Sequence, residues 1–541
     1  MNKLYDLPSP THTNASLEVY SGFWSFESAA HLLRRTTYGV APEVIKESVS
    51  LGLEQTLDQL LEDKPLPNEP INFYYEADPN VPVGSSWIDQ PFESSNNQLL
   101  GSRRRSLAAW TLGNLINSGM HIREKMTFFW NNHFVTQSSI LQDPNLIYHN
   151  ITMLREESLG NFRTLVEKVT ISPGMLRYLN GNQNSAAAPN ENYARELFEL
   201  FTIGKGALAA PGDYTTFTEE DVFEAAKVLT GWRDVGYFMR DGNVPGSIFR
   251  SGRHDRSTKQ LSHRFNHVTI ENGGENEYKT LIGIILSQEE VAKYICRNLY
   301  RWFVYYDISD TVENQVIEPL ADILRNNDYE IKPVLRALLS SQHFFEVVNM
   351  GPMIKNPLDF MVNLLTQFTV DFPSNDIAAY TIWSAFLRAL ESFEINYYEP
   401  PNVAGFKAYY QEPLYYRTWI TAATLPVRQN YTNAMSSGNI RIGDFLLSID
   451  ILGYISRFND PFDPNTLIDE FVANNFPRPI TVNQRDFLKN ILIPGLPDFE
   501  WTLEYGNHIN DPNNEEIKRS VENKLRSFLA AFLNMPEYNL S

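Results

Sequence analysis

Apolar residues recur at helical spacing in several separate stretches of the chain. Between residues 27 and 36, Ala29, Ala30, Leu32 and Leu33 fall on one side of the helical repeat, which is typical of a helix with one buried face. The same pattern predicts helices over residues 107–116, 121–135, 191–203 and 219–230.

Polar residues at helix starts sharpen two of these predictions. Asn190 directly precedes the helix expected at 191–203, and Thr218 precedes the one expected at 219–230. Asp221 follows Thr218 by three residues, which is the spacing of a capping box. We therefore expect both helices to begin at these caps.

Three long stretches interrupt the helical pattern and are treated as insertions: residues 62–100, 233–280 and 458–515. They are irregular or rich in proline, asparagine and serine, and Asp241-Gly242 is typical of a β-hairpin turn. No repeat of solenoid length is present. The sequence predicts a mainly α protein: one large helical domain over residues 21–541, with long irregular insertions and a minor β-hairpin, after an N-terminal extension at 1–20.

Composition and charge restrict the classes of function. Of the 541 residues, 43% are hydrophobic, which is enough for a sizeable core, and 45 basic against 65 acidic residues give a net charge of −20. This balance argues against a general nucleic-acid binder. No apolar run approaches the roughly 18 residues that a membrane span needs. Cys296 is the single cysteine, so the chain has neither an internal disulfide nor a cysteine-based metal cage.

The helix expected at 191–203 carries an acidic face. Glu191, Arg195 and Glu199 are spaced four residues apart, so one arginine could bridge two carboxylates, and Asn192 and Glu196 lie beside this row. A carboxylate left without an arginine, as expected for Glu196, is the one most free to bind a metal or to move a proton. The alternative is a solvated face with ordinary helix salt bridges.

Residues 250–264 form a local basic segment in an acidic chain. Five basic residues surround one acid, Asp255, and His254 precedes it. Such a segment could receive a phosphate, sulfate or carboxylate group, with Lys259 among its cations. The alternative is a basic surface that pairs with acidic residues elsewhere. The His-Asp doublet superficially suggests a metal phosphohydrolase, but that class needs further ligands on helices.

Three single residues complete the set of candidates. His133 continues an apolar helical stripe, so it points inward, either as a satisfied core residue or as a group that faces a buried pocket. Trp232 ends the helix that follows Thr218 and either caps the core or contacts a ligand. Asn402 lies in a stiff turn after two prolines, and such turns either fix a side chain for binding or redirect the chain.

Read together, several segments resemble one bacterial family of unknown function, DUF1800. The resemblance runs in order along almost the whole chain. The matching segments are HLLRRTTYG (31–39), REKMTFFWNNHFVT (123–136), NENYARELFELFTIG (190–204), FTEEDVFEAAKVLTGW (217–232), RHD with Lys259 (253–259), KNPLDF (355–360), PPNVAGF (400–406) and MPEY (535–538).

The resemblance implies a helical protein but no established activity. It also implies export and a neighbouring protein similar to alkaline phosphatases and sulfatases, whereas the start of this sequence has no apolar signal segment and favours the cytoplasm. The family's recurrent polar residues fall on Arg34, Arg35, Arg123, His133, Asn190, Glu191, Arg195, Glu196, Glu199, Thr230, Trp232, His254, Asp255, Lys259, Asn356 and Asn402.

Two functional hypotheses follow. The first is a hydrolase-type enzyme that acts on a polar or anionic extracellular substrate. In it Glu196 is a general base or a ligand of a divalent metal, and His254 with Asp255 is the acid–base partner. The residues expected to bind the substrate are Arg195, Lys259, Asn192, Trp232, His133 and Asn402.

The second hypothesis is a non-catalytic binding or assembly component. It would work with a phosphatase- or sulfatase-like protein or a surface glycan, and its arginine–glutamate pairs would organise the scaffold. The first hypothesis predicts that Glu196, His254 and Asp255 converge on one concave pocket. The second predicts buried, fully paired Arg195–Glu191 and Arg195–Glu199 contacts, with no open pocket beside them.

Overall fold

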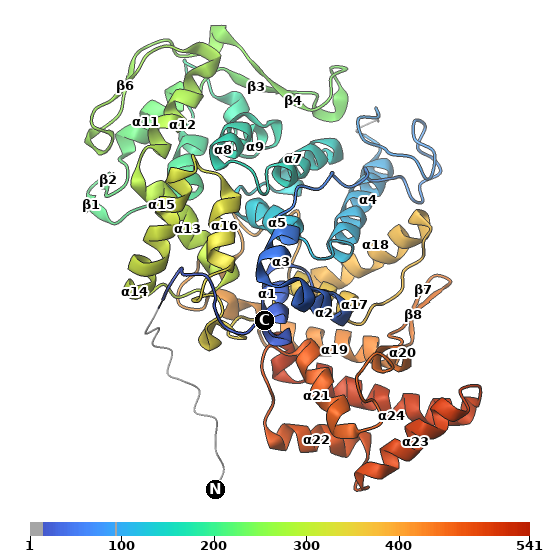
Figure 1. Ribbon diagram of the computed structural model, residues 1–541. Coiled ribbons are helices and arrows are strands. Elements are labelled where there is room, and N and C mark those ends of the chain that lie inside the picture. Colours follow the sequence, from blue (N-terminus) through green and yellow to red (C-terminus); the bar gives the residue numbers. More distant parts are fainter. Residues whose placement is uncertain (1–14, 92–94) are drawn as a thin grey trace.

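The computed structural model describes residues 15–91 and 95–541, and it confirms a mainly α protein (Figure 1). Within these residues the strands form only two-stranded antiparallel sheets. One continuous cluster of buried apolar side chains runs from Ala15 to Tyr538. No helix in the described ranges is both long and apolar enough to span a bilayer. Residues 1–14 of the expected N-terminal extension lie outside the described residues, and its boundary at residue 20 stays a prediction.

Most of the first helices lie in the middle of the molecule, and the fourth lies to one side of it (Figure 1). They are α1 (Phe26–Thr36), α2 (Pro42–Leu51), α3 (Leu53–Leu60), α4 (Asn97–Ile116) and α5 (Arg123–His133). In the insertion expected at 62–100, the described residues before α4 are irregular, and of the described part only the last residues are helical. The expected helices at 27–36 and 107–116 are found within α1 and α4, whereas α5 is two residues shorter at each end than the helix expected at 121–135.

The next segment forms the part of the molecule that carries most of the small sheets (Figure 1). Its helices are α6 (Ser138–Leu141), α7 (Pro144–Glu156), α8 (Phe162–Ile171), α9 (Pro173–Tyr178), α10 (Glu191–Glu196), α11 (Glu219–Val228) and α12 (Glu277–Leu286). Its strands are β1 (Leu208–Ala210), β2 (Asp213–Tyr214), β3 (Trp232–Val235), β4 (Gly246–Phe249), β5 (Lys259–Gln260) and β6 (Thr269–Ile270). The expected hairpin is the β3–β4 pair, with Gly242 at φ +75° in its connection.

The remaining helices flank the middle and form a further layer toward the C-terminus. They are α13 (Glu289–Phe303), α14 (Asp310–Val312), α15 (Glu318–Asn326), α16 (Ile331–Leu339), α17 (Pro357–Gln367), α18 (Asp376–Ser392), α19 (Thr424–Ser437), α20 (Ile451–Ile455), α21 (Pro464–Asn475), α22 (Val482–Leu492), α23 (Asp498–Asn510) and α24 (Glu515–Leu533). The strands β7 (Ile440–Ile442) and β8 (Phe445–Leu447) pair between α19 and α20.

The segment 458–515 differs from the irregular insertion that its composition suggested. It contains α21, α22 and α23, because its prolines and capping residues mark helix starts rather than breaks. Pro464 occupies the first turn of α21 behind the cap Asp463, and Pro497 immediately precedes α23. Thr481 and Gln484 form a capping box at the start of α22.

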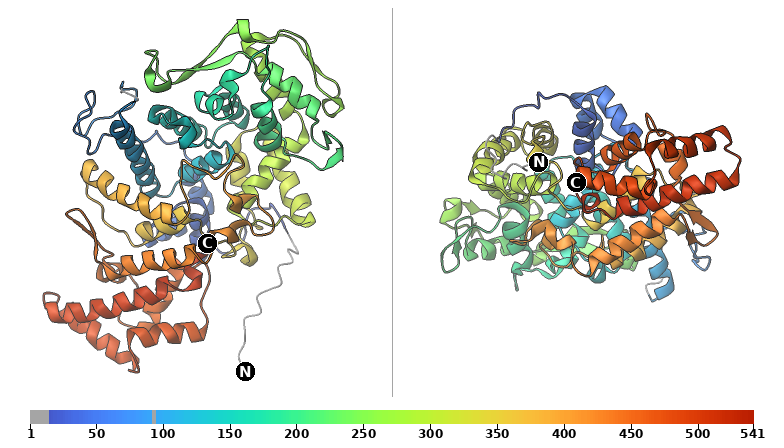
Figure 2. Two further views of the ribbon diagram at one scale, coloured as in Figure 1. Left: turned by 180° about the vertical axis from the view of Figure 1, so that it is seen from behind. Right: turned by 90° about the horizontal axis from the view of Figure 1, so that it is seen from below.

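The end of the chain returns to the middle of the molecule, as the views from behind and below also show (Figure 2). Leu540 pairs with Ile354 in an isolated bridge just before α17. The Lys355 amide donates to the Asn539 carbonyl at 2.8 Å. The last residues therefore tie the layer of α19–α24 to the centre.

Candidate functional site

The acidic helix begins as predicted and then changes its winding. Asn190 caps α10, but the chain continues from Leu197 to Thr202 as a π-helical segment, η2, instead of the single α-helix expected. A π turn holds more residues than an α turn, so side chains beyond Glu196 rotate out of the row that α-helical spacing predicts. Glu199 therefore does not reach Arg195. It pairs instead with Lys205, whose Nζ lies 3.0 Å from each carboxylate oxygen.

Arg195 connects α10 to α11. Its guanidinium donates to both carboxylate oxygens of Glu219, at 2.8 and 2.7 Å, and to Glu191 at 3.2 Å. The expected i, i+4 pair with Glu191 is confirmed, whereas the second carboxylate is Glu219 rather than Glu199. A two-point contact of this kind fixes the angle between the two helices. Asn192 is exposed on the same helix.

Glu196 is the carboxylate that this network leaves out. Its side chain is partly buried and forms no hydrogen bond or ion pair with the described residues. Burial, followed by the charge of Glu199, raises the pKa of Glu196. Burial and the negative charge of Glu196 in turn raise the pKa of Tyr178 to about 12. Glu196 thus has the properties of a proton-transferring group but no catalytic partner in contact with it.

His254 is fixed in a buried cluster of charges. Its Nε2 lies 2.9 Å from a carboxylate oxygen of Glu277, and its Nδ1 lies 2.9 Å from the Thr230 carbonyl oxygen. The Nζ of Lys259 lies 2.5 Å from the other oxygen of Glu277, and both Lys259 and Glu277 are fully buried. Both ring nitrogens of His254 already face oxygen atoms, so neither is available to a substrate in this conformation.

Asp255 turns the chain beside this cluster. Its carboxylate accepts hydrogen bonds from the amide and hydroxyl of Ser257, at 2.8 and 2.5 Å, and its own amide donates to the hydroxyl of Thr230. Burial raises the pKa of Asp255, but the Ser257 hydrogen bonds and the Lys259 charge outweigh burial and hold it below its usual value. Asp255 therefore remains an ionised turn residue and does not contact the His254 ring.

The acidic helix and the His-Asp loop are attached to opposite ends of α11. Arg195 binds Glu219 in its first turn, whereas His254 binds Thr230 just beyond its last turn. Nine helical steps separate Glu219 from Val228, which is about 14 Å. No described contact joins Glu196 to His254 or Asp255, and their assignment to one catalytic group stays a prediction.

The other predicted binding residues lie apart from one another. His133 is held at 3.0 Å from the Phe201 carbonyl oxygen, among aromatic side chains, and burial lowers its pKa to about 4. Trp232 begins β3 and packs against Phe249 and Tyr278. Asn402 closes its turn by accepting from the Ala404 amide and donating to a tyrosine hydroxyl. Their role in substrate binding stays a prediction.

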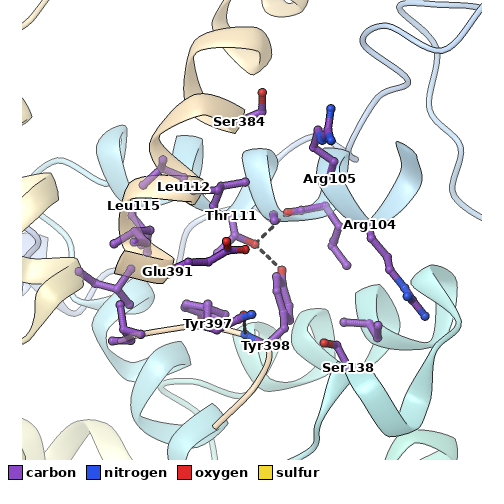
Figure 3. A pocket seen from close by; sticks show the side chains of 18 residues that line it. Arg104, Arg105, Thr111, Leu112, Leu115, Ser138, Ser384, Glu391, Tyr397 and Tyr398 are labelled. Atoms are coloured by element: carbon purple, nitrogen blue, oxygen red, sulfur yellow. Dashed lines mark hydrogen bonds between the residues drawn. The ribbon is translucent and has the colours of Figure 1, made fainter. Parts of the chain in front are cut away.

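A cleft between α4 and α18 is a further candidate that the sequence did not indicate (Figure 3). It has a volume of about 330 Å³, and the segment that carries Tyr397 and Tyr398 closes one side. Tyr398 hydrogen-bonds to the hydroxyl of Thr111 on α4. The apolar lining residues are Leu107, Ala108, Leu112, Leu115, Ile147, Leu358, Leu387, Leu390 and Ile395.

Polar side chains surround this apolar lining. Arg104 and Arg105 of α4, Ser138, and Ser384 and Glu391 of α18 all line the cleft (Figure 3). Residues 104 and 391 are almost 300 positions apart, so no local sequence pattern could place them together. Only packing of α4 against α18 brings them to one cleft.

Arg104 and Arg105 are held differently. The Nε and Nη2 of Arg104 donate to the Gln142 carbonyl oxygen, at 3.1 and 2.5 Å. The exposed guanidinium of Arg105 lies over the ring of Tyr74, 5.4 Å from its centre. Both cations therefore retain donors for an anion at the cleft.

The described residues contain no group of three or more histidine, cysteine, aspartate or glutamate side chains arranged to hold a metal ion. The divalent metal considered from the sequence thus has no assigned ligand set among residues 15–91 and 95–541. Lys259 and His254 share Glu277, and a bound cation there would have to displace Lys259 from its carboxylate.

Comparison with known proteins identifies the family of this chain but no individual relative. A family model described as "Protein of unknown function (DUF1800)" matches residues 31–540, which is nearly the whole chain. No curated protein and no solved structure matches the chain. The segments that resembled this family in the sequence are thus parts of one continuous match, and the chain belongs to the DUF1800 family of proteins of unknown function.

Proposed function

We propose that this protein is a non-catalytic binding component that holds a small organic anion in the cleft between α4 and α18. The observation that carries the proposal is the cleft itself, about 330 Å³ in volume, with an apolar lining and two arginines against one glutamate, Glu391. Ligand sites of this kind combine an apolar surface with a few polar groups that fix orientation. The ligand class is therefore an apolar body that carries a carboxylate, phosphate or sulfate group.

The contacts of His254, a predicted catalytic residue, and of Arg195 and Lys259, predicted substrate-binding residues, support binding over hydrolysis. The Arg195–Glu219 pair joins two helices, and the buried His254–Glu277–Lys259 cluster anchors a loop. These groups stabilise the scaffold through contacts that a catalytic role would have to break. A phosphatase- or sulfatase-like partner, a surface glycan and the cellular location stay predictions that rest on the family resemblance and on the start of the sequence.

A pair of fluorescent probes tests this proposal. 8-Anilinonaphthalene-1-sulfonate is apolar and anionic, whereas N-phenyl-1-naphthylamine is its close neutral analogue. We expect saturable fluorescence enhancement with the sulfonate and at least about tenfold weaker binding of the neutral probe, because the arginines contribute charge-assisted hydrogen bonds.

Variants then locate the binding. Ala108→Trp should fill the cleft and abolish saturable binding of both probes, and Arg105→Glu should weaken the sulfonate selectively. Arg441→Glu, which makes the same charge change at an exposed position of β7, is the matched control. Equal binding of the sulfonate to wild-type protein and Ala108→Trp would refute the assignment of the cleft.

The partly buried, unpaired Glu196 supports a second candidate function, a hydrolase in which this carboxylate is the general base. Turnover of 4-nitrophenyl phosphate and 4-nitrophenyl sulfate by the purified protein is the test. In this case Glu196→Gln should reduce turnover at least about 100-fold, whereas Glu275→Gln, an exposed glutamate, should not change it. Turnover that persists in Glu196→Gln would reject the second candidate.

A further inference from the structure

Five cationic side chains are buried at the centre of the molecule, apart from the cleft described above. Arg34 and Arg35 come from α1 and Lys125 from α5, while Lys355 precedes α17 and Arg428 lies on α19. None of these residues exposes more than 8% of its surface. Burial lowers the pKa of Arg34, Arg35 and Arg428 to about 10, so all three stay charged at neutral pH.

Most of these cations are held by uncharged groups. Arg34 donates to the carbonyl oxygens of Ala473 and Asn474, at 2.8 and 3.0 Å, and Arg35 donates to the carbonyl of Asn349 at 2.8 Å. The buried Nε atoms of Arg34 and Arg35 have no hydrogen-bond partner. Carbonyl oxygens orient a guanidinium but do not neutralise its charge.

Lys355 and Arg428 are held in the same way. Lys355 donates to the Asn363 side chain at 3.1 Å, and its Nζ lies 4.4 Å from the centre of the Tyr538 ring. Arg428 donates to the Lys355 carbonyl at 2.8 Å, and its Nε also has no partner. None of these contacts supplies a negative charge.

One carboxylate is paired within this group. Asp359 of α17 forms an ion pair with Lys125, and the described chain shows no other ion pair to these five cations. An unpaired buried charge is unfavourable relative to the same charge in water, so an excess of cations at one place needs a reason. Within the described residues none of the three arginines forms an ion pair, and the charges of Glu27 and Asp359 act on them only at longer range.

A small cavity opens among these residues. Its volume is about 30 Å³, more than the 10–15 Å³ that one water needs. Arg34, Arg35, Lys125, Asn356 and Asp359 line it with polar groups. The remaining lining residues are Trp302, Met353, Ile354, Tyr409, Tyr416, Trp419 and Ser541.

We propose that this cavity is a binding site for a small inorganic oxyanion of the phosphate or sulfate type, held chiefly by Arg34, Arg35 and Lys125. Guanidinium groups match the oxygen geometry of such anions, and the site supplies the donors that lack acceptors. The segments HLLRRTTYG, REKMTFFWNNHFVT and KNPLDF meet here, so the site also accounts for polar residues that the cleft does not use. It is independent of the function proposed for the cleft.

Calorimetric titration with inorganic phosphate and with sulfate, on the full chain dialysed free of both, tests the site. Thermal unfolding is measured in parallel at constant ionic strength, with chloride as the reference anion. We expect one oxyanion per chain and a midpoint that rises by several degrees with phosphate or sulfate but not with chloride. The calorimetry shows which of the two oxyanions is preferred.

Two variants with opposite expected effects complete the experiment. Arg35→Gln keeps a donor for the Asn349 carbonyl but removes a charge, and it should weaken binding at least about tenfold. Asp359→Asn removes the opposing carboxylate and should strengthen binding, which keeps the test valid if Arg35→Gln fails to fold. Arg336→Gln, at a partly exposed ion pair, is the matched control.

Three results would overturn the proposal. The first is a wild-type midpoint that responds to phosphate and sulfate no more than to chloride. The second is equal oxyanion affinity in Arg35→Gln and Arg336→Gln. The third is unchanged or weaker affinity in Asp359→Asn, since neutralising a carboxylate beside an anion site must favour the anion.

Discussion

At the scale of single residues, buried charges dominate this protein. Glu277 lies between His254 and Lys259 and is fully buried together with Lys259. Whether a buried charge cluster adds net stability depends on the balance between the desolvation cost and the electrostatic attraction. Removing Glu277 leaves the buried Lys259 cation unpaired. The residue that organises the His-Asp loop is therefore Glu277, which the sequence analysis did not single out.

Replacing Glu277 is expected to destabilise the folded protein. Glu277→Ala should lower the free energy of unfolding by about 3–5 kcal/mol, because Lys259 then stays buried without a counter-charge. Urea-induced unfolding followed by circular dichroism measures this loss. Asp322→Asn, at an exposed ion pair with Arg325, is the control and should change stability by less than about 1 kcal/mol. A comparably small loss in Glu277→Ala would mean that water solvates Lys259.

His133 predicts a dependence of stability on pH. Burial lowers its folded-state pKa to about 4, while the unfolded chain titrates near 6.5. Between these values the unfolded state binds more protons, so acidification favours unfolding. The free energy of unfolding should fall by up to about 3 kcal/mol from this residue as the pH drops from 7 to 4, and should not change on its account above pH 7.

The measurement for His133 is a difference between variants, because burial also lowers the pKa of His31 and of His121. His133→Gln should show a shallower loss of stability between pH 7 and pH 4 than the wild type. His267→Gln, at an exposed position, is the control and should retain the wild-type slope. Identical slopes in all three proteins would show that His133 is solvated enough to titrate normally.

At the scale of elements, α11 connects the acidic helix to the His-Asp loop. The capping-box residue Asp221 is fully buried, and its carboxylate accepts from Thr218 as well as from the amide and hydroxyl of Ser262, both at 2.7 Å. The capping box predicted from the sequence is therefore present, but it also anchors the segment that follows β5. One side chain thus begins a helix and fixes a loop.

Asp221→Ala should be more harmful than the loss of an ordinary cap. We expect a loss of about 2–4 kcal/mol, because helix donors and the Ser262 groups are left unpaired together. Chemical denaturation measures the change, and Glu220→Ala in the same helical turn is the exposed control. A loss near 1 kcal/mol, as for a simple cap, would show that the Ser262 contacts contribute little.

At the scale of the whole molecule, the end of the chain connects two layers. Tyr538 is fully buried, with its ring 5.5 Å from that of Phe360 on α17 and beside the Lys355 ammonium. The bridge between Ile354 and Leu540 runs next to it. Packing at this point couples the centre to the layer of α19–α24.

Tyr538→Ala should weaken this connection. Loss of a buried aromatic ring is expected to cost about 3–5 kcal/mol. Hydrogen–deuterium exchange should become faster in α17 and α19, which meet around Tyr538, and stay unchanged in the distant α11. Phe499→Ala, at a residue with 62% of its surface exposed, should alter neither stability nor exchange. Uniformly faster exchange would instead indicate global destabilisation.

Much of the fold follows from the sequence alone. Periodicity and caps placed α1, α11 and the start of α10, because these signals involve residues only a few positions apart. The Asp241-Gly242 turn likewise marked the β3–β4 hairpin. The composition of 458–515 gave a wrong prediction, because proline and asparagine are favoured at helix starts as well as in loops.

The candidate sites depended on tertiary structure. The sequence identified Arg195 and His254 as charged groups in distinct motifs, but their partners Glu219 and Glu277 come from other elements, and the π-helical turn moves Glu199 away from Arg195. The cleft between α4 and α18 and the cavity among Arg34, Arg35 and Lys125 join segments hundreds of residues apart. Local patterns determine where helices begin and which faces are apolar, whereas the pairing of buried charges depends on which faces pack together.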